Sequence, residues 1–150
     1  MNTDASIPID DFDYETFING FEEVTYWHYA WYSKIMGALL YDQTKIIQGH
    51  HECRFGKFMD QTPIPPGQTK EFNTVRELHQ QMHEAASTLM SSRILGRKPP
   101  ESIFKEFSET QGLFTAAFNA LLRSAMLSQA EQKCRASFGM GKAPVPPTSA

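Results

Sequence analysis

Apolar residues recur every three or four positions between residues 17 and 39, and this spacing constrains the fold more than any other feature of the chain. Such a pattern places its members on one side of an α-helix, which must then be buried against other elements. The stripe consists of Phe17, Phe21, Val24, His28, Trp31, Ile35 and Leu39. The segment is therefore predicted to be a core-facing helix that carries one histidine, His28, inward.

Two further segments share this periodicity. The stripe between residues 72 and 90 is bordered by His79 and His83, which point inward if the segment is helical. A longer stripe predicts a final helix that begins near Ile103. The two stripes consist of Phe72, Val75, Leu78, Met82, Ala86, Leu89 and Met90, and of Phe104, Phe107, Phe114, Ala117, Phe118, Leu121 and Ala125.

Proline and glycine residues separate the predicted helices. Residues 61–70 contain Pro63, Pro65, Pro66 and Gly67 and cannot continue a helix. Gly96 and the pair at 99–100 end one helix and open the next. Before the first of these breaks, the segment that contains Cys53 carries its own apolar residues, and we expect a short helix there.

These elements predict an all-α fold, a four-helix bundle with a short cysteine-bearing helix. We expect one domain over residues 15–135, because 150 residues suffice for a single core. Residues 1–14 are expected to form an N-terminal extension. Residues 136–150 have too few apolar side chains to bury and are expected to form a disordered tail.

Three histidines and one cysteine lie where the bundle core is expected, namely His28, Cys53, His79 and His83. Imidazole and thiolate are zinc ligands, and four of them complete a tetrahedral site. Residues four apart on a helix are about 6 Å apart along its axis, so His79 and His83 can bind one ion. The sequence thus predicts a zinc site in the bundle core. A site closed by four protein ligands leaves no position for a reactive water, which argues against hydrolysis.

Each of these residues taken alone has a simpler explanation. A core histidine more often forms a hydrogen bond with a carbonyl than a bond to a metal ion. A free cysteine is often just a small buried side chain. Their joint occurrence favours a metal. Arg54 and Lys57 are expected to favour the Cys53 thiolate. His50 and His51 are alternative ligands that more plausibly flank the loop, and Cys134 is assigned no role.

Four motifs together resemble the chemoreceptor zinc-binding domain that bacteria attach to chemoreceptors and diguanylate cyclases. They are His28-Tyr29-Ala30-Trp31, Cys53-Arg54-Phe55-Gly56-Lys57-Phe58, Leu78-His79-Gln80-Gln81-Met82-His83, and Phe114-Thr115-Ala116-Ala117-Phe118. The last motif resembles the versions on diguanylate cyclases, and the likeness covers roughly residues 15–130. Phe58 departs from the family, which usually has tryptophan there, and we expect this to change packing under the thiolate but not ligation.

The resemblance implies a zinc-binding sensory or regulatory domain. Zinc is the implied cofactor, and oxidants such as hypochlorous acid are expected to act through Cys53. We expect a stand-alone domain that acts on a partner in trans, a diguanylate cyclase of cyclic-di-GMP signalling or a chemoreceptor of chemotaxis. The resemblance also implies a two-fold homodimer, and Tyr29, Tyr32, Met36 and Leu40 form either part of the core or the dimer interface.

Other functions fit less well. A net charge of −3 and a pI near 5.9 do not favour nucleic acid. No apolar run approaches the roughly 20 residues of a membrane span, and the first residues are acidic, so a cytoplasmic protein is expected. A zinc protease would need glutamate at position 80, where this chain has glutamine, and we expect no enzyme. The alternatives left open are a hemerythrin-like iron or dioxygen carrier and a purely structural, zinc-stabilised dimerisation module.

Overall fold

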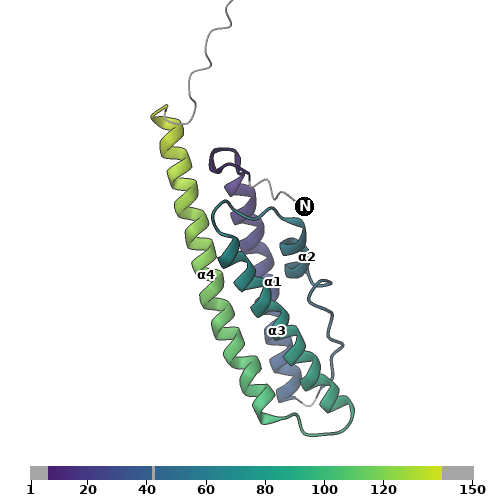
Figure 1. Cartoon of the computed structure of the whole chain (residues 1–150). Coiled ribbons are helices and arrows are strands. Elements are labelled where there is room, and N and C mark those ends of the chain that lie inside the picture. The colour runs from purple at the N-terminus through teal and green to yellow at the C-terminus, as the bar shows by residue number, and fades with distance from the viewer. Residues whose placement is uncertain (1–6, 42, 140–150) are drawn as a thin grey trace, which may run out of the picture.

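The computed structural model describes residues 7–41 and 43–139 and is helical throughout its regular structure. Its elements are η1 (Ile9–Asp11), α1 (Tyr14–Leu40), α2 (Arg54–Gln61), α3 (Thr69–Ile94) and α4 (Glu101–Ser137). In Figure 1, α1 and α3 run in the same direction and α4 returns beside them, while short α2 lies on one side of the bundle. The predicted all-α class, with a short cysteine-bearing helix, is confirmed.

Local sequence explains where the helices begin and end. The Asp13 carboxylate caps α1 by accepting hydrogen bonds from the Thr16 backbone N–H and hydroxyl, at 3.0 and 2.7 Å. Gly67 before α3 and Gly96 after it have φ of 74° and 67°, which favours glycine. Pro100 precedes α4 and has extended backbone. The helix boundaries predicted from proline and glycine are therefore confirmed.

The core is rich in aromatic side chains contributed by all four α-helices. Its largest fully buried members are Tyr14, Phe17, Phe21, Phe55, Phe72, Phe107, Phe114, Met82, Leu89, Met90, Leu121 and His79. The three predicted stripes face this core, with one exception. Phe104 was expected to be buried but is 38% exposed, because it lies in the first turn of α4 beside a surface cavity that Leu39 and Leu40 also line.

The residues before α1 attach to the far end of α4. The Gln132 side-chain amide donates to the carbonyls of Ile9 and Phe12, at 2.8 and 2.9 Å. Phe12 is buried and its ring packs edge-on against Tyr14 at 4.7 Å. The first part of the predicted extension and most of the predicted tail, residues 1–6 and 140–150, lie outside the described residues.

The aromatic face of α1 divides into two parts. Tyr32 and Met36 are partly buried against the core, and the Tyr29 hydroxyl donates to Thr115 Oγ1 at 3.2 Å. Tyr26 and Leu40 are exposed by 67% and 73%. The middle of this face is thus part of the core, and its flanks remain the candidate for the expected dimer interface. None of the helices in the described part of the chain is long and apolar enough to span a membrane.

Candidate metal centre

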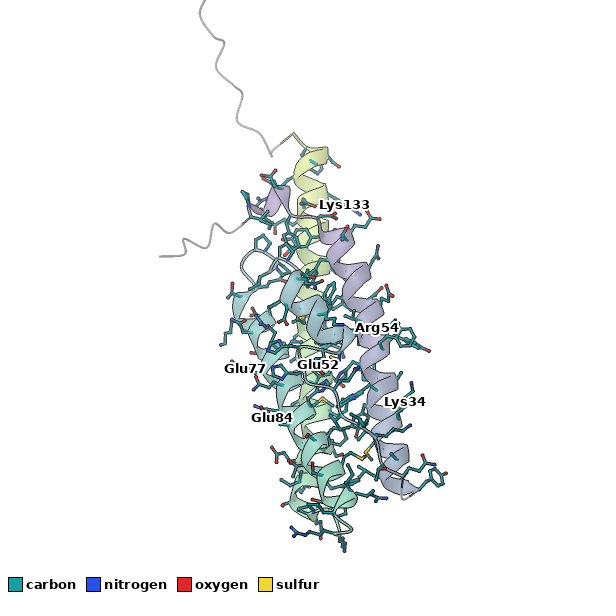
Figure 2. All side chains as sticks on the ribbon, turned by 90° about the vertical axis from the view of Figure 1, so that its right-hand side faces the viewer. Lys34, Glu52, Arg54, Glu77, Glu84 and Lys133 are labelled. Atoms are coloured by element: carbon teal, nitrogen blue, oxygen red, sulfur yellow. The ribbon has the colours of Figure 1, made fainter. Side chains whose placement is uncertain are left out.

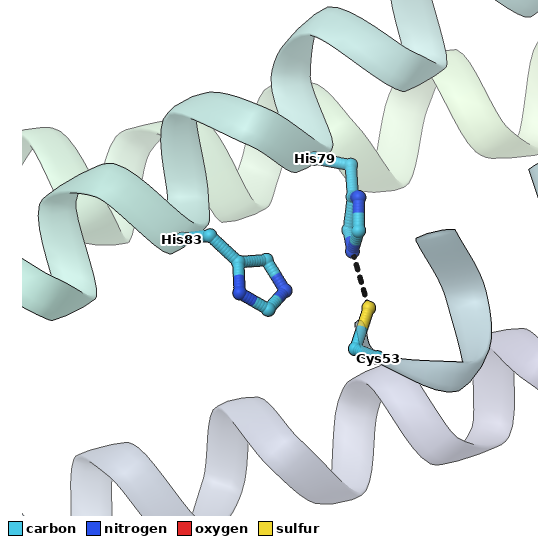
Figure 3. Close-up of side chains that lie close together, drawn as sticks. All are labelled: Cys53, His79 and His83. Atoms are coloured by element: carbon cyan, nitrogen blue, oxygen red, sulfur yellow. Dashed lines mark hydrogen bonds between the residues drawn. The ribbon is translucent and has the colours of Figure 1, made fainter. Parts of the chain in front are cut away.

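Cys53, His79 and His83 form one compact cluster between α2 and α3. Their candidate ligand atoms all lie within 4.8 Å of one another. Both histidines project from α3 toward the start of α2, as Figure 3 shows, because residues four apart lie on the same face of a helix. The Cys53 Sγ is 3.1 Å from His79 Nε2. Three of the four predicted ligands are therefore brought together.

Cys53 lies at the N-cap of α2, where its sulfur accepts a hydrogen bond from the Gly56 backbone N–H at 3.2 Å. Burial raises the pKa of the thiol, whereas hydrogen bonds from the Gly56 and Phe55 backbone lower it. The expected influence of Arg54 and Lys57 on the thiolate stays a prediction. The Arg54 guanidinium stacks over the Trp27 ring at 4.1 Å.

Gly56 is required by the close approach of two backbone segments. A Cβ at this position would collide with the oxygen and carbon of the His50 carbonyl. The absence of a side chain lets the turn before Cys53 pack directly on the first turn of α2. This packing positions the sulfur opposite α3.

His83 is oriented by a backbone carbonyl. Its Nδ1 lies 2.8 Å from the Gln48 carbonyl oxygen, which can only accept a hydrogen bond, so Nδ1 carries the proton and Nε2 keeps its lone pair. That Nε2 is buried and has no hydrogen-bond partner. The Trp31 ring stacks on the imidazole with centroids 4.4 Å apart. A metal-binding histidine commonly has this arrangement, with the second nitrogen held by a carbonyl or carboxylate.

His28 lies beside the cluster but outside the group whose ligand atoms are all within 4.8 Å. Its ring centroid is 5.4 Å from that of His79 and 4.3 Å from that of Phe114 on α4. The side chain is buried and its Nε2 has no hydrogen-bond partner. His28 is therefore close enough to contribute after a local shift, and its role as the fourth ligand stays a prediction.

The three buried imidazoles are held neutral. Burial, and next the neighbouring His83, lower the pKa of His28 to about 3 and that of His79 to about 2. Burial also lowers the pKa of His83, although its bond to the Gln48 carbonyl opposes this. Neutral imidazole is the form that binds a metal ion.

The donor set fits zinc. Two imidazole nitrogens are buried without a partner, next to a third imidazole and a thiol at a helix N-terminus. Nitrogen and sulfur are the ligands that zinc prefers, and a buried polar atom without a partner costs about 1–3 kcal/mol, which a bound ion would relieve. The iron site of a hemerythrin-like carrier would require carboxylate ligands, and this cluster contains none.

The side chains of His50 and His51 are outside the close group of Cys53, His79 and His83, although the Cys53 thiol donates to the His50 carbonyl at 3.6 Å. His51 is largely exposed and its Nδ1 is 2.6 Å from Asp60 Oδ2. Cys134 is exposed on α4. Phe58 packs against Gly20 and lies 6.0 Å from Phe17, whereas the ring that touches the histidines is Phe55, 4.7 Å from His79.

Sequence reasoning did not find two contributors to the site. Gln48 acts through its backbone carbonyl, so its side chain carries no signal. Gly56 was quoted only as part of a motif, and its close approach to the His50 carbonyl is visible only in the fold.

Comparison with known proteins bears on this cluster. Residues 28–90 match the sequence model of the chemoreceptor zinc-binding domain. Over these residues the chain is similar to that domain. The match begins at His28, includes Cys53, His79 and His83, and is shorter than the 15–130 expected from the resemblance. No curated protein and no solved structure matches the chain.

The metal centre is expected to depend on the absence of a side chain at residue 56. Gly56→Ala should lower the free energy of unfolding by about 1–3 kcal/mol through overpacking, and should reduce bound zinc by displacing Cys53. The matched control is Gly112→Ala in α4, where an added Cβ meets nothing within 4 Å and helix propensity gains up to about 1 kcal/mol. Urea unfolding and elemental analysis measure both effects. Equal behaviour of the two variants would contradict the assignment.

Metal-free protein is expected to lose stability as the pH falls below 6.5, the ordinary pKa of imidazole. Between 6.5 and the folded-state pKa values of about 3 and 2, the unfolded chain binds more protons than the folded chain, so stability decreases with falling pH. In this window, each buried imidazole should lower the free energy of unfolding by about 1.4 kcal/mol for every unit by which the pH falls. Urea unfolding of chelator-treated protein at pH 7.5 and 5.5 measures the difference, and equal stabilities would contradict neutral burial.

Proposed function

We propose that the chain is a zinc-responsive regulatory domain in which His28, Cys53, His79 and His83 bind one zinc ion. The observation that carries the proposal is the compact group of Cys53, His79 and His83. Beside it, the buried Nε2 atoms of His83 and of the neighbouring His28 have no hydrogen-bond partner. A zinc ion would supply the partner that each of them lacks. The same ion would neutralise the charge of the thiolate.

The four residues come from three separate elements, which is why occupancy would change the domain. Cys53 is the N-cap residue of α2, His79 and His83 lie on α3, and His28 lies on α1. When bound, zinc supplies four bonds that hold these elements together, so binding is also folding free energy. His28 also packs on Phe114, and a shift of His28 toward the ion would alter its contact with α4. Metal-loaded and metal-free forms would then differ in rigidity and helix packing.

Cys53 is also the proposed point of action for an oxidant. Its sulfur is partly buried and lines a cavity of about 180 Å³ between α1 and α2. Attack of the thiolate on hypochlorous acid gives the sulfenic acid and chloride, with the sulfur oxidised by two electrons and the chlorine reduced by two. A sulfenic acid is a poorer zinc ligand than a thiolate, so oxidation would weaken the site.

The output is proposed to be a signalling partner bound in trans, a diguanylate cyclase or a chemoreceptor, in the cytoplasm. Kinship with the versions of the domain found on diguanylate cyclases belongs to this proposal. The proposed homodimer would use the exposed aromatic flank of α1, where Tyr26 and Trp27 pack edge-on at 5.5 Å. A purely structural zinc module remains the competing function, and partner capture with and without a chelator separates the two.

Purified protein is expected to contain about one zinc ion per chain. Cys53→Ala, His79→Ala and His28→Ala should each reduce this content, because every substitution removes one ligand. Cys134→Ala is the matched control, since it removes an exposed thiol outside the cluster. Elemental analysis measures the content. Zinc that is insensitive to the first three substitutions would exclude this site.

Oxidation is expected to release zinc or change its coordination in a manner that depends on Cys53. Treatment with about one equivalent of hypochlorous acid should free zinc from wild-type protein, because the thiolate is the most nucleophilic group of the site. Cys134→Ala protein should respond like the wild type. Cobalt-substituted protein reports coordination by its absorption, and mass spectrometry locates the added oxygen. A full response in protein with Cys53→Ser would sink the oxidant hypothesis.

A further inference from the structure

Two cavities reach the metal centre from different sides of α2. One, the α2–α3 cavity, is about 320 Å³ and is lined among others by His50, His51, Asp60, Glu77 and His79. The other, the α1–α2 cavity, is about 180 Å³ and is lined by Lys34 and Arg54 together with His28, Cys53 and His83. In Figure 2, Glu77 lies on the α3 side, whereas Lys34 of α1 and Arg54, the first residue of α2, lie on the α1 side.

The two cavities differ in charge. The α2–α3 cavity carries two carboxylates, Asp60 and Glu77, and one guanidinium, Arg76, which pairs with Asp60 at 3.1 Å. The described residues that line the α1–α2 cavity include two cations and no carboxylate. A cleft that carries negative charge raises the local concentration of cations and their rate of association. A divalent cation is therefore favoured at the α2–α3 cavity and repelled at the other.

His51 at the mouth of the α2–α3 cavity is oriented as a metal ligand. Its Nδ1 lies 2.6 Å from Asp60 Oδ2, and Asp60 is fixed in turn by Arg76. A carboxylate that accepts from Nδ1 leaves the Nε2 lone pair available, which is the usual arrangement of a metal-binding histidine. The His51 side chain is 62% exposed, and the centroids of the His50 and His51 rings are 4.0 Å apart. Two imidazoles thus stand where hydrated zinc would first arrive.

His79 connects this mouth to the buried cluster. It lines the α2–α3 cavity, and its Nε2 lies 3.1 Å from Cys53 Sγ. His50 and His51 therefore share a cavity with a residue of the proposed zinc site. His50, His51 and His79, together with His28 and His83, are all five histidines of the chain.

We propose that His50 and His51 form a transient zinc-binding site that captures the ion from solvent and passes it through the α2–α3 cavity to His79 and Cys53. The inference rests on the proposed zinc site and concerns how that site is loaded. Neither histidine is a ligand of the final complex. The pair determines how fast zinc is acquired and has little effect on how much is held at equilibrium.

The test is the rate of zinc loading. Metal-free protein is mixed with one equivalent of Zn²⁺, and zinc not yet bound is trapped at successive times by a chromogenic chelator. The double variant His50→Gln/His51→Gln should load about tenfold more slowly than wild type, in line with the usual effect of electrostatic focusing and a lost ligand relay, yet reach the same final zinc content. Asp60→Asn should also slow loading, because it removes the carboxylate that orients His51.

Lys34→Gln at the other cavity is the matched control and should load at the wild-type rate or faster. A wild-type rate in the double variant would overturn the transient site. Reduced final zinc content in that variant would also overturn it, because the histidines would then be permanent ligands. Absence of zinc uptake by the wild-type protein would instead refute the proposed zinc site itself, so the two failures are distinguishable.

Discussion

The neutral burial of three imidazoles is the constraint on which the rest of this structure depends. An apolar, aromatic core accepts His28, His79 and His83 only in their uncharged form, as their lowered pKa values show. Each then needs a partner for its free nitrogen, because an unsatisfied buried polar atom is costly. The carbonyl of Gln48 satisfies His83 at Nδ1 and leaves Nε2 for another group. The core of this helical bundle therefore contains buried imidazole nitrogens that a metal ion would satisfy.

Short α2 makes this arrangement possible. α1 and α3 alone supply only imidazoles, and the thiol comes from the turn that leads into α2. The turn can lie this close because Gly56 presents no side chain to the His50 carbonyl. The helix N-terminus that receives the sulfur also carries partial positive charge, which favours a thiolate there. One helical turn therefore positions the sulfur and adjusts its chemistry.

Much of this could be predicted from the sequence, because periodicity reports directly on burial. The stripes of α1, α3 and α4 and the inward direction of His79 and His83 followed from spacing alone. Phe104 was misassigned, since periodicity cannot tell that a stripe has reached the end of the bundle, where little covers it. The contact of the Arg54 guanidinium with Trp27 was not foreseen, because nearness along the chain does not fix the direction of a side chain. Contacts made by backbone atoms, such as that of Gln48, leave no trace in the residue types.

The stacking of Trp31 on His83 has a consequence for observing the protein. The indole and the imidazole lie nearly parallel, with an angle of 16° between their planes and 4.4 Å between their centroids. Indole emission is quenched by a neighbouring charged imidazole and responds to the electric field of a nearby ion. The site therefore contains its own fluorophore, in contact with a proposed ligand and separate from the solvent-facing Trp27. Changes at His83 should therefore alter the indole fluorescence of the unlabelled chain through Trp31.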